Sequence, residues 1–117
     1  MKIFRIFTIC LFCFGLVACD NKQELLSDKV YFFYQESCPH CHNAKEYIDN
    51  NYPNLKMEEL DIAEHNAREL FIKCAKKFNL GNRLGTPLFC MDNNYIMGWS
   101  KRNEKKFERL VKPFLNH

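Results

Sequence analysis

The sequence Ser37-Cys38-Pro39-His40-Cys41-His42 joins a run typical of a buried strand to a segment with helical spacing. The run before it, residues 30 to 34, is apolar on both faces, as in a central strand covered by helices on each side. Proline suits the first turn of a helix, where a missing N–H costs nothing. The pattern therefore predicts a helix from Pro39 to about residue 51, with Cys38 at its positive end.

That position predicts a reactive thiol. Orphan N–H groups and the helix dipole favour the thiolate of Cys38, as does the imidazole of His40 between the two cysteines. Cys41 shares a helical stripe with Ala44 and Ile48, so we expect it to face the core. Cys38 is then the attacking sulfur and Cys41 the resolving sulfur of a pair that cycles between dithiol and disulfide.

Other uses of the two cysteines are a structural disulfide, half of a zinc site or a copper(I) site. Structural zinc usually has four ligands, and no second close Cys/His pair follows. A metallochaperone-type binding module would instead hold copper(I) through the soft ligands Cys38 and Cys41 together with His42. The redox interpretation assigns no metal.

Composition limits the classes of protein that are possible. The chain has 117 residues, 47% hydrophobic and 26% charged, which suits one small globular domain. The formal charge is +3, and loss of Lys2 and Arg5 would leave 15 basic residues against 14 acidic ones. This balance gives no reason to expect nucleic acid as a partner.

The N-terminus has the pattern of a targeting segment. Two basic residues precede an apolar run from about residue 6 to 17, too short to span a bilayer as a mature helix. The run ends in Leu16-Val17-Ala18-Cys19, which resembles the lipobox of bacterial lipoproteins. The resemblance implies cleavage after residue 18, lipid on Cys19 and anchoring in the cell envelope, on the periplasmic side. Asp20 resembles the lipoprotein signal for the inner membrane, whereas ordinary secretion would leave Cys19 a free thiol.

These features divide the chain into a signal peptide (1–18), a lipidated tether (19–28) and one domain (29–117). Cys10 and Cys13 would leave with the signal peptide. The four cysteines of the domain then lie in a compartment that permits disulfides. Of these, Cys74 and Cys90 are either two buried thiols or a second disulfide.

The domain reads as β-α-β-α-β-β-α. We expect a mixed sheet with helices on both faces, because a parallel crossover unit is followed by an antiparallel hairpin. The expected elements after the first helix are an edge strand at 56–60, a helix capped by Asp61 and ended by Gly81, strands at 86–91 and 95–99, and a last helix capped by Ser100 and interrupted or ended at Pro113.

This order, with three local motifs, resembles the thioredoxin superfamily in its minimal, glutaredoxin-like form. The motifs are Cys38-Pro39-His40-Cys41 after the first strand, Thr86-Pro87 before the hairpin and Gly98 at the end of the last strand. The resemblance implies an α/β thioredoxin-like fold with a four-stranded mixed sheet. It also implies a cis peptide bond before Pro87, close to the redox pair, and a Thr86 backbone that pairs with an extended substrate peptide.

The motifs leave the direction of exchange open. Pro39-His40 between the cysteines resembles the periplasmic disulfide oxidases, whereas threonine before Pro87 looks more like the periplasmic isomerases and reductases. Phe32 stands where thioredoxins and oxidases commonly place a buried acid, so resolution would use water or a neighbour such as Glu36. The stretch Gly98-Trp99-Ser100 lacks the second glycine and the acidic residue that are typical of glutaredoxin glutathione sites. This departure argues against glutathione binding.

Together these features predict a membrane-anchored, extracytoplasmic thiol:disulfide oxidoreductase. It would exchange disulfides with cysteine-containing protein substrates through a Cys38 mixed disulfide resolved by Cys41. The redox-active disulfide would replace any cofactor, and a redox partner protein would restore it. With no dimerisation domain in the sequence, we expect a monomer.

Overall fold

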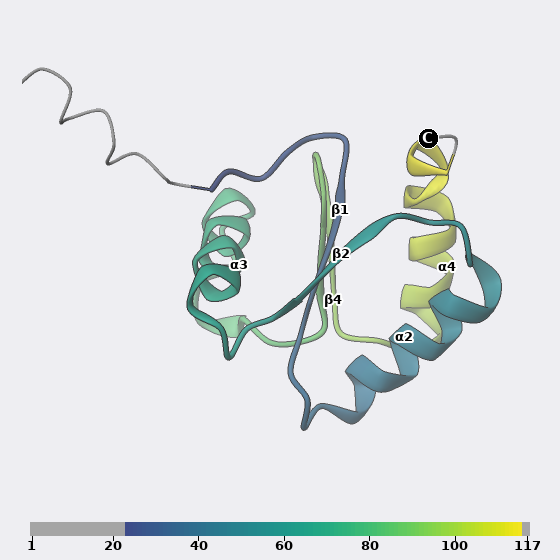
Figure 1. Cartoon of the computed structure of the whole chain (residues 1–117), viewed down its shortest axis with the longest axis horizontal. Helices are drawn as coiled ribbons and strands as arrows, with labels where there is room; N and C mark the ends of the chain where they lie inside the picture. Colours follow the sequence, from purple (N-terminus) through teal and green to yellow (C-terminus); the bar gives the residue numbers. More distant parts are fainter. Residues whose placement is uncertain (1–22, 116–117) are drawn as a thin grey trace, which may run out of the picture.

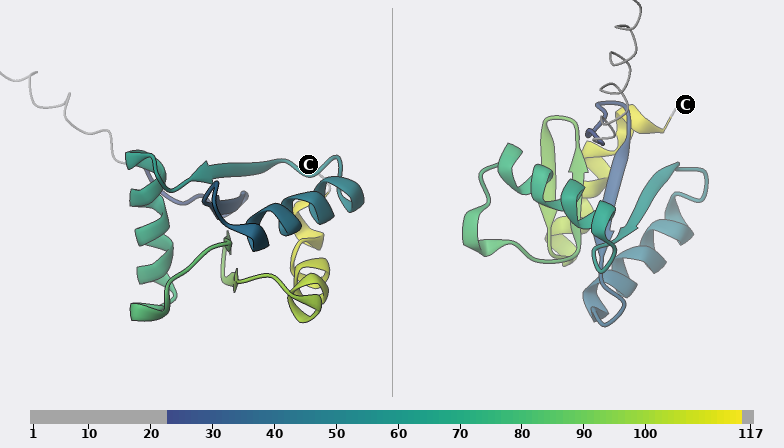
Figure 2. Two further views of the ribbon diagram at one scale, coloured as in Figure 1. Left: turned by 90° about the horizontal axis from the view of Figure 1, so that it is seen from below. Right: turned by 60° about the vertical axis from the view of Figure 1, so that its left-hand side comes forward.

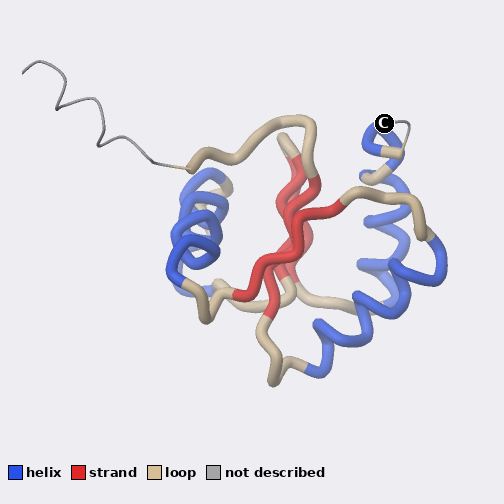
Figure 3. The backbone as a smooth tube through the Cα atoms, viewed as in Figure 1, coloured by secondary structure: helices blue, strands red, loops and turns tan. Residues whose placement is uncertain are grey.

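Four strands form one mixed sheet at the centre of the computed structural model, which describes residues 23 to 115. They are β1 (Val30–Tyr34), β2 (Met57–Asp61), β3 (Leu88–Met91) and β4 (Asn94–Met97). The spatial order is β2-β1-β3-β4, with β1 parallel to β2 and antiparallel to β3, and β3 antiparallel to β4. Figure 3 shows the strands together between the helices. The predicted four-stranded mixed sheet is confirmed.

Part of the sequence prediction falls outside the described residues. The signal peptide, the lipidation site Cys19 and the C-terminal His117 are in this group. The end of the tether is described, where Lys73 donates a hydrogen bond to the backbone oxygen of Gln23 and pairs with Glu24 at 3.6 Å. Within residues 23–115, no helix is both long and apolar enough to cross a bilayer.

Three helices cover the two faces of the sheet. Helices α2 (Pro39–Asn51) and α4 (Lys101–Leu110) lie on one face, and α3 (His65–Lys77) lies on the other (Figures 1 and 2). Short 3-10 turns follow α3 at Gly81–Arg83 and α4 at Lys112–Phe114. The sheet therefore separates two hydrophobic cores, and its two inner strands, β1 and β3, contribute to both.

Strand β1 shows why this chain folds around its first apolar run. Its residues alternate between the two cores: Val30 and Phe32 pack under α2 and α4, and Tyr31 and Phe33 pack under α3. All four side chains are buried. Strand β2 is an edge strand as predicted, one residue later than expected, and its Glu58 and Glu59 are exposed. The central position of β1 therefore follows from an apolar run with no polar face.

The start of α3 differs from the prediction. Asp61 does not cap the helix, because it is the last residue of β2. Its carboxylate accepts a hydrogen bond from the Ala63 N–H at 3.0 Å and so closes the turn after the strand. Glu64 is the N-cap residue, and its side chain makes no capping hydrogen bond.

The end of α3 differs as well, because Gly81 does not terminate it. The helix ends at Lys77, and Asn79 takes the left-handed conformation with φ +56°. The N–H groups of Asn79 and Leu80 bond the carbonyls of Lys76 and Ala75 at 3.2 and 2.9 Å. Asparagine tolerates this conformation and closes the helix as glycine often does.

The hairpin and α4 follow the prediction with shorter strands. Strand β3 begins after Pro87, and β4 ends at Met97 because Gly98 turns the chain with φ +88°. Ser100 caps α4 as expected, its hydroxyl oxygen accepting a hydrogen bond from the Asn103 N–H at 3.2 Å. The helix ends at Leu110, shortly before Pro113, as a proline at that point requires.

Candidate active site at the start of helix α2

Cys38 is the N-cap residue of α2, with an extended backbone (φ −98°, ψ 107°). Its sulfur accepts a hydrogen bond from the Cys41 N–H at 3.1 Å. Its carbonyl oxygen accepts from the N–H groups of Cys41 and His42 at 3.1 and 3.3 Å. The sulfur therefore lies at the N-terminus of α2 and accepts the Cys41 N–H, and both the helix dipole and this hydrogen bond stabilise a thiolate when the pair is reduced.

Cys38 and Cys41 form a disulfide, with their Cα atoms 5.2 Å apart. The two sulfurs differ in environment. Cys41 is only 2% exposed and packs with Ala44 and Ile48 in the core under α2, whereas Cys38 is partly exposed. The predicted burial of Cys41 on the helical stripe is confirmed, and only Cys38 is open to attack by a protein thiol.

The loop before β3 lies directly beside this disulfide. The Thr86–Pro87 peptide bond is cis, as the resemblance implied, and the sulfur of Cys38 is 3.7 Å from the carbonyl oxygen of Thr86. The side-chain amide of Gln35 donates to the Thr86 hydroxyl at 3.2 Å. The pairing of β3 with β1 positions this loop, because Leu88 stands opposite Phe33 in the register.

The two histidines of the motif, His40 and His42, lie in different environments. His40 is exposed in the first turn of α2 and lines a hollow together with Trp99 and Lys101. His42 is exposed, and its Nε2 lies 2.7 Å from the carbonyl oxygen of Glu36. Across residues 23–115, no three His, Cys, Asp or Glu side chains gather in a way that could hold a metal ion.

Trp99 lies in an aromatic cluster between α2 and α4. Its ring centroid is 5.5 Å from that of Tyr47, 5.7 Å from that of Phe89 and 6.0 Å from that of Phe107. Burial raises the pKa of Tyr47, so its phenol stays protonated at neutral pH. Trp99 therefore acts first as a packing residue, and as the one tryptophan of the chain it can report on this region by fluorescence.

Cys74 and Cys90 form a second disulfide, which decides between the two alternatives that the sequence left open. It joins α3 to β3 across the other core, with the Cα atoms 6.4 Å apart, and both residues are buried. The first disulfide lies on the opposite face of the sheet, in the core under α2. The second disulfide is therefore inaccessible to a protein substrate.

Two features near Cys41 and Thr86 were missed in the sequence. One is the hydrogen bond from Gln35 to Thr86, which joins residues 51 positions apart. The other is an ion pair between Lys45 and Glu59 at 3.4 Å. Lys45 stands one helical turn after Cys41, which was a usable signal, but its partner depends on the register of β2.

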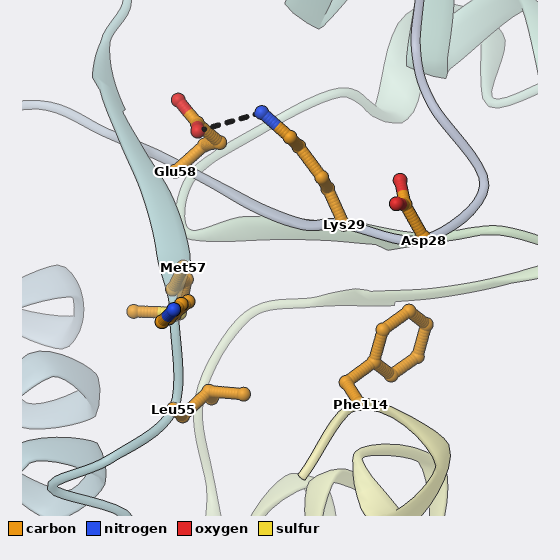
Figure 4. Close-up of a pocket in the computed structure, with 7 residues that line it drawn as sticks. Asp28, Lys29, Leu55, Met57, Glu58 and Phe114 are labelled. Atoms are coloured by element: carbon orange, nitrogen blue, oxygen red, sulfur yellow. Dashed lines mark hydrogen bonds and ion pairs between the residues drawn. The ribbon is translucent and has the colours of Figure 1, made fainter. Parts of the chain in front are cut away.

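A separate cavity of about 560 Å³ lies at the far end of β1, where β1 and β2 begin (Figure 4). Asp28, Leu55, Met57 and Phe114 line it, and at its edge Lys29 and Glu58 form an ion pair at 3.1 Å. Because Cys38 follows the other end of β1, this cavity is not part of the site around the disulfide.

No family model matches the chain, and no curated protein matches it. Several solved structures do. A glutaredoxin from Archaeoglobus fulgidus matches with a TM-score of 0.55 and 18% identity, over 79% of this chain and 99% of that one. The thioredoxin-like protein BC3987 matches with a TM-score of 0.52 and 22% identity, over 67% and 97%. A buckwheat glutaredoxin, solved with glutathione, matches with a TM-score of 0.51 and 15% identity, over 74% of each chain. These likenesses confirm the predicted thioredoxin-like fold.

Proposed function

We propose that this chain, a thioredoxin-like fold with a Cys38–Cys41 disulfide, is a thiol:disulfide oxidoreductase acting on cysteine-containing proteins. The observation that carries the proposal is the position of Cys38. Its sulfur faces the N–H groups at the start of α2 and lies 3.7 Å from the Thr86 carbonyl beside a cis-proline. One partly exposed sulfur and one buried sulfur in a single disulfide suit sequential exchange.

In the reducing direction, the Cys38 thiolate attacks one sulfur of a substrate disulfide. The other substrate sulfur leaves as a thiolate, and a mixed disulfide forms. Cys41 then loses its proton and attacks the sulfur of Cys38, which releases the second substrate sulfur and closes the Cys38–Cys41 disulfide. The substrate gains two electrons and the protein loses two. The oxidising direction runs the same steps in reverse.

The polypeptide around the substrate cysteine would lie along the loop at Thr86 and Pro87. We propose that it pairs with the Thr86 backbone as an added strand, because the Thr86 carbonyl oxygen lies 3.7 Å from the Cys38 sulfur. The substrate would thus be bound mainly by backbone contacts, which suits many different sequences. A redox partner protein would return the pair to its starting state, and no cofactor is needed.

We also propose a location outside the cytoplasm, at the periplasmic side of a bacterial membrane, with the chain anchored by lipid on Cys19. Support comes from the buried second disulfide, Cys74–Cys90, because structural disulfides persist mainly in oxidising compartments. The signal Asp20 after the lipidated residue favours the inner membrane, and the chain would act there as a monomer.

Replacing Cys19 by alanine should move the protein from the membrane fraction to the soluble periplasmic fraction. Lipid chains contribute about 0.8 kcal/mol per buried CH₂, and without Cys19 no acyl chain can be attached. Fractionation with immunoblotting measures the change. A Cys13→Ala variant is the matched control, because that residue would leave with the signal peptide. Equal membrane retention of the Cys19 variant would contradict the anchor.

Replacing Cys41 by serine should trap the exchange at the mixed disulfide. The reduced variant can attack insulin through Cys38, but it lacks the sulfur that releases the product. We expect a covalent complex on non-reducing gels that a reductant removes. The matched control is the Cys38→Ser/Cys41→Ser double variant, which should form none. If the single variant also forms none, exchange does not run through Cys38.

The reduction potential of the Cys38–Cys41 pair decides the direction. Equilibration with glutathione buffers can be followed by the fluorescence of Trp99, which packs on the same core as Cys41. A reduction potential of about −120 mV is typical of disulfide donors, and one of about −270 mV is typical of reductases. About 30 mV corresponds to 1.4 kcal/mol, so the two classes are well separated.

A further inference from the structure

A cavity of about 180 Å³ opens beside the buried cysteine of the redox pair. It lies between β1, β2 and the first turns of α2, and Cys41, Phe32, Lys45 and Glu59 are among the residues that line it. A space of this size holds several water molecules, and its walls carry charged groups that such water can contact. The cavity therefore offers water a place beside Cys41, although this residue is only 2% exposed.

Cys41 has to lose a proton each time it resolves a mixed disulfide. Its packing neighbours in the core, Phe32, Ala44 and Ile48, are apolar and accept no proton. Burial among such groups disfavours a thiolate. A proton acceptor must therefore reach Cys41 from the cavity, because the charged side chains near Cys41 in the described part of the chain lie there.

Glu59 is fixed in position to act in this way. It stands beside Phe32 in the register of β1 and β2, so its side chain lies on the face of the sheet that α2 covers. There its carboxylate meets the Lys45 Nζ at 3.4 Å. Lys45 comes one helical turn after Cys41, and its Nζ also bonds both carboxylate oxygens of Asp49 at 2.7 and 2.6 Å. Glu59 thus enters the cavity from the strand and Lys45 from the helix.

The surroundings of Lys45 and Tyr34 set the protonation of two groups that line the cavity. The hydrogen bond with Asp49, followed by the attraction of Glu59, raises the pKa of Lys45, so the ammonium persists at neutral pH. Burial raises the pKa of Tyr34, whose phenol therefore stays protonated and accepts no proton. The remaining titratable side chains that line the cavity are those of His42 and Glu36. The Nε2 of His42 lies 2.7 Å from the backbone carbonyl oxygen of Glu36. Of the carboxylates lining the cavity, Glu59 is the one held by a cation.

We propose that Glu59, oriented by Lys45, accepts the proton of Cys41 through water in this cavity. The step rests on the proposed exchange function. The Cys41 S–H bond breaks and its proton passes through water to the Glu59 carboxylate. The thiolate attacks Cys38, the bond between Cys38 and the substrate sulfur breaks, and the substrate leaves as a thiolate. In the oxidising direction, Cys41 leaves as a thiolate and takes the proton back.

The test uses the reduced mature protein and an aromatic disulfide whose released thiolate is coloured. Attack by Cys38 releases one thiolate at a rate proportional to the reagent concentration. Attack by Cys41 on the resulting mixed disulfide releases a second at a rate independent of that concentration. The two phases therefore report the two cysteines separately.

Glu59→Gln should slow the concentration-independent phase about a hundredfold at neutral pH and leave the rate of the first phase nearly unchanged. The deficit should shrink as the pH rises, because Cys41 then ionises without help. Lys45→Gln, which frees the carboxylate from its partner, should slow the same phase less. Glu58→Gln is the matched control: it makes the same charge change one residue away, where the side chain pairs with Lys29 instead. It should change neither phase.

The outcomes separate this inference from the proposed function. An unchanged second phase in Glu59→Gln, with a normal first phase, overturns the role of Glu59 alone. Equal slowing of both phases, or the same slowing in Glu36→Gln or Glu58→Gln, also overturns it. A wild-type protein with no concentration-independent phase would instead contradict exchange through Cys38 and Cys41.

Discussion

The Cys38→Ser protein should reduce insulin no faster than the buffer does. A serine hydroxyl is not ionised at neutral pH and cannot form a disulfide, so the first exchange step is lost. The variant should keep its fold, because serine is a favoured N-cap residue and its oxygen can accept the Cys41 N–H that now bonds the sulfur. Insulin precipitation in the presence of a reductant measures the loss.

Two controls make this result specific. Circular dichroism should show the same helix content in the Cys38→Ser variant and the wild type. Ser37→Ala, one residue away on the exposed side of the motif, should keep its turnover. Turnover retained in the Cys38→Ser variant would mean that another group attacks the substrate.

Loss of the second disulfide should lower the stability strongly and the activity little. Cys74 and Cys90 are 16 residues apart, and closing a loop of this length contributes about 3 kcal/mol. For a domain of this size, the Cys74→Ala/Cys90→Ala variant should unfold roughly 12 to 24 °C below the wild type. Calorimetry of the oxidised proteins measures the difference.

Exchange activity at room temperature should survive this double substitution. The second disulfide lies in the core under α3, and the redox pair lies in the core under α2, on the other face of the sheet. A single Cys74→Ala variant is the control for lost packing without a second change. A melting temperature unaltered by the double substitution would mean that the bond does not stabilise the fold, and lost activity would indicate coupling between the two disulfides.

Local patterns predicted the elements around the active site well. Strand β1 and helix α2 have the expected bounds, because a fully apolar run and a proline at the first helical position are strong signals. Boundaries set by capping were less predictable. Asp61 has the spacing of a cap but belongs to β2, whose pairing with β1 extends to that residue and holds its backbone extended. Gly81 was expected to end α3, yet Asn79 does so.

Local sequence patterns were enough to predict the order of the elements, the position of Cys38 at a helix N-terminus and the burial of Cys41, since each depends on neighbours within one or two turns. The family resemblance already implied that the loop at Thr86 lies beside the redox pair. Two other points depended on the folded chain: Cys74 bonds Cys90, and Glu59 shares a cavity with Cys41. Each joins distant segments through the register of the sheet or the packing of a helix on it. Those long-range pairings are chosen by the burial of whole faces together, which no local pattern contains.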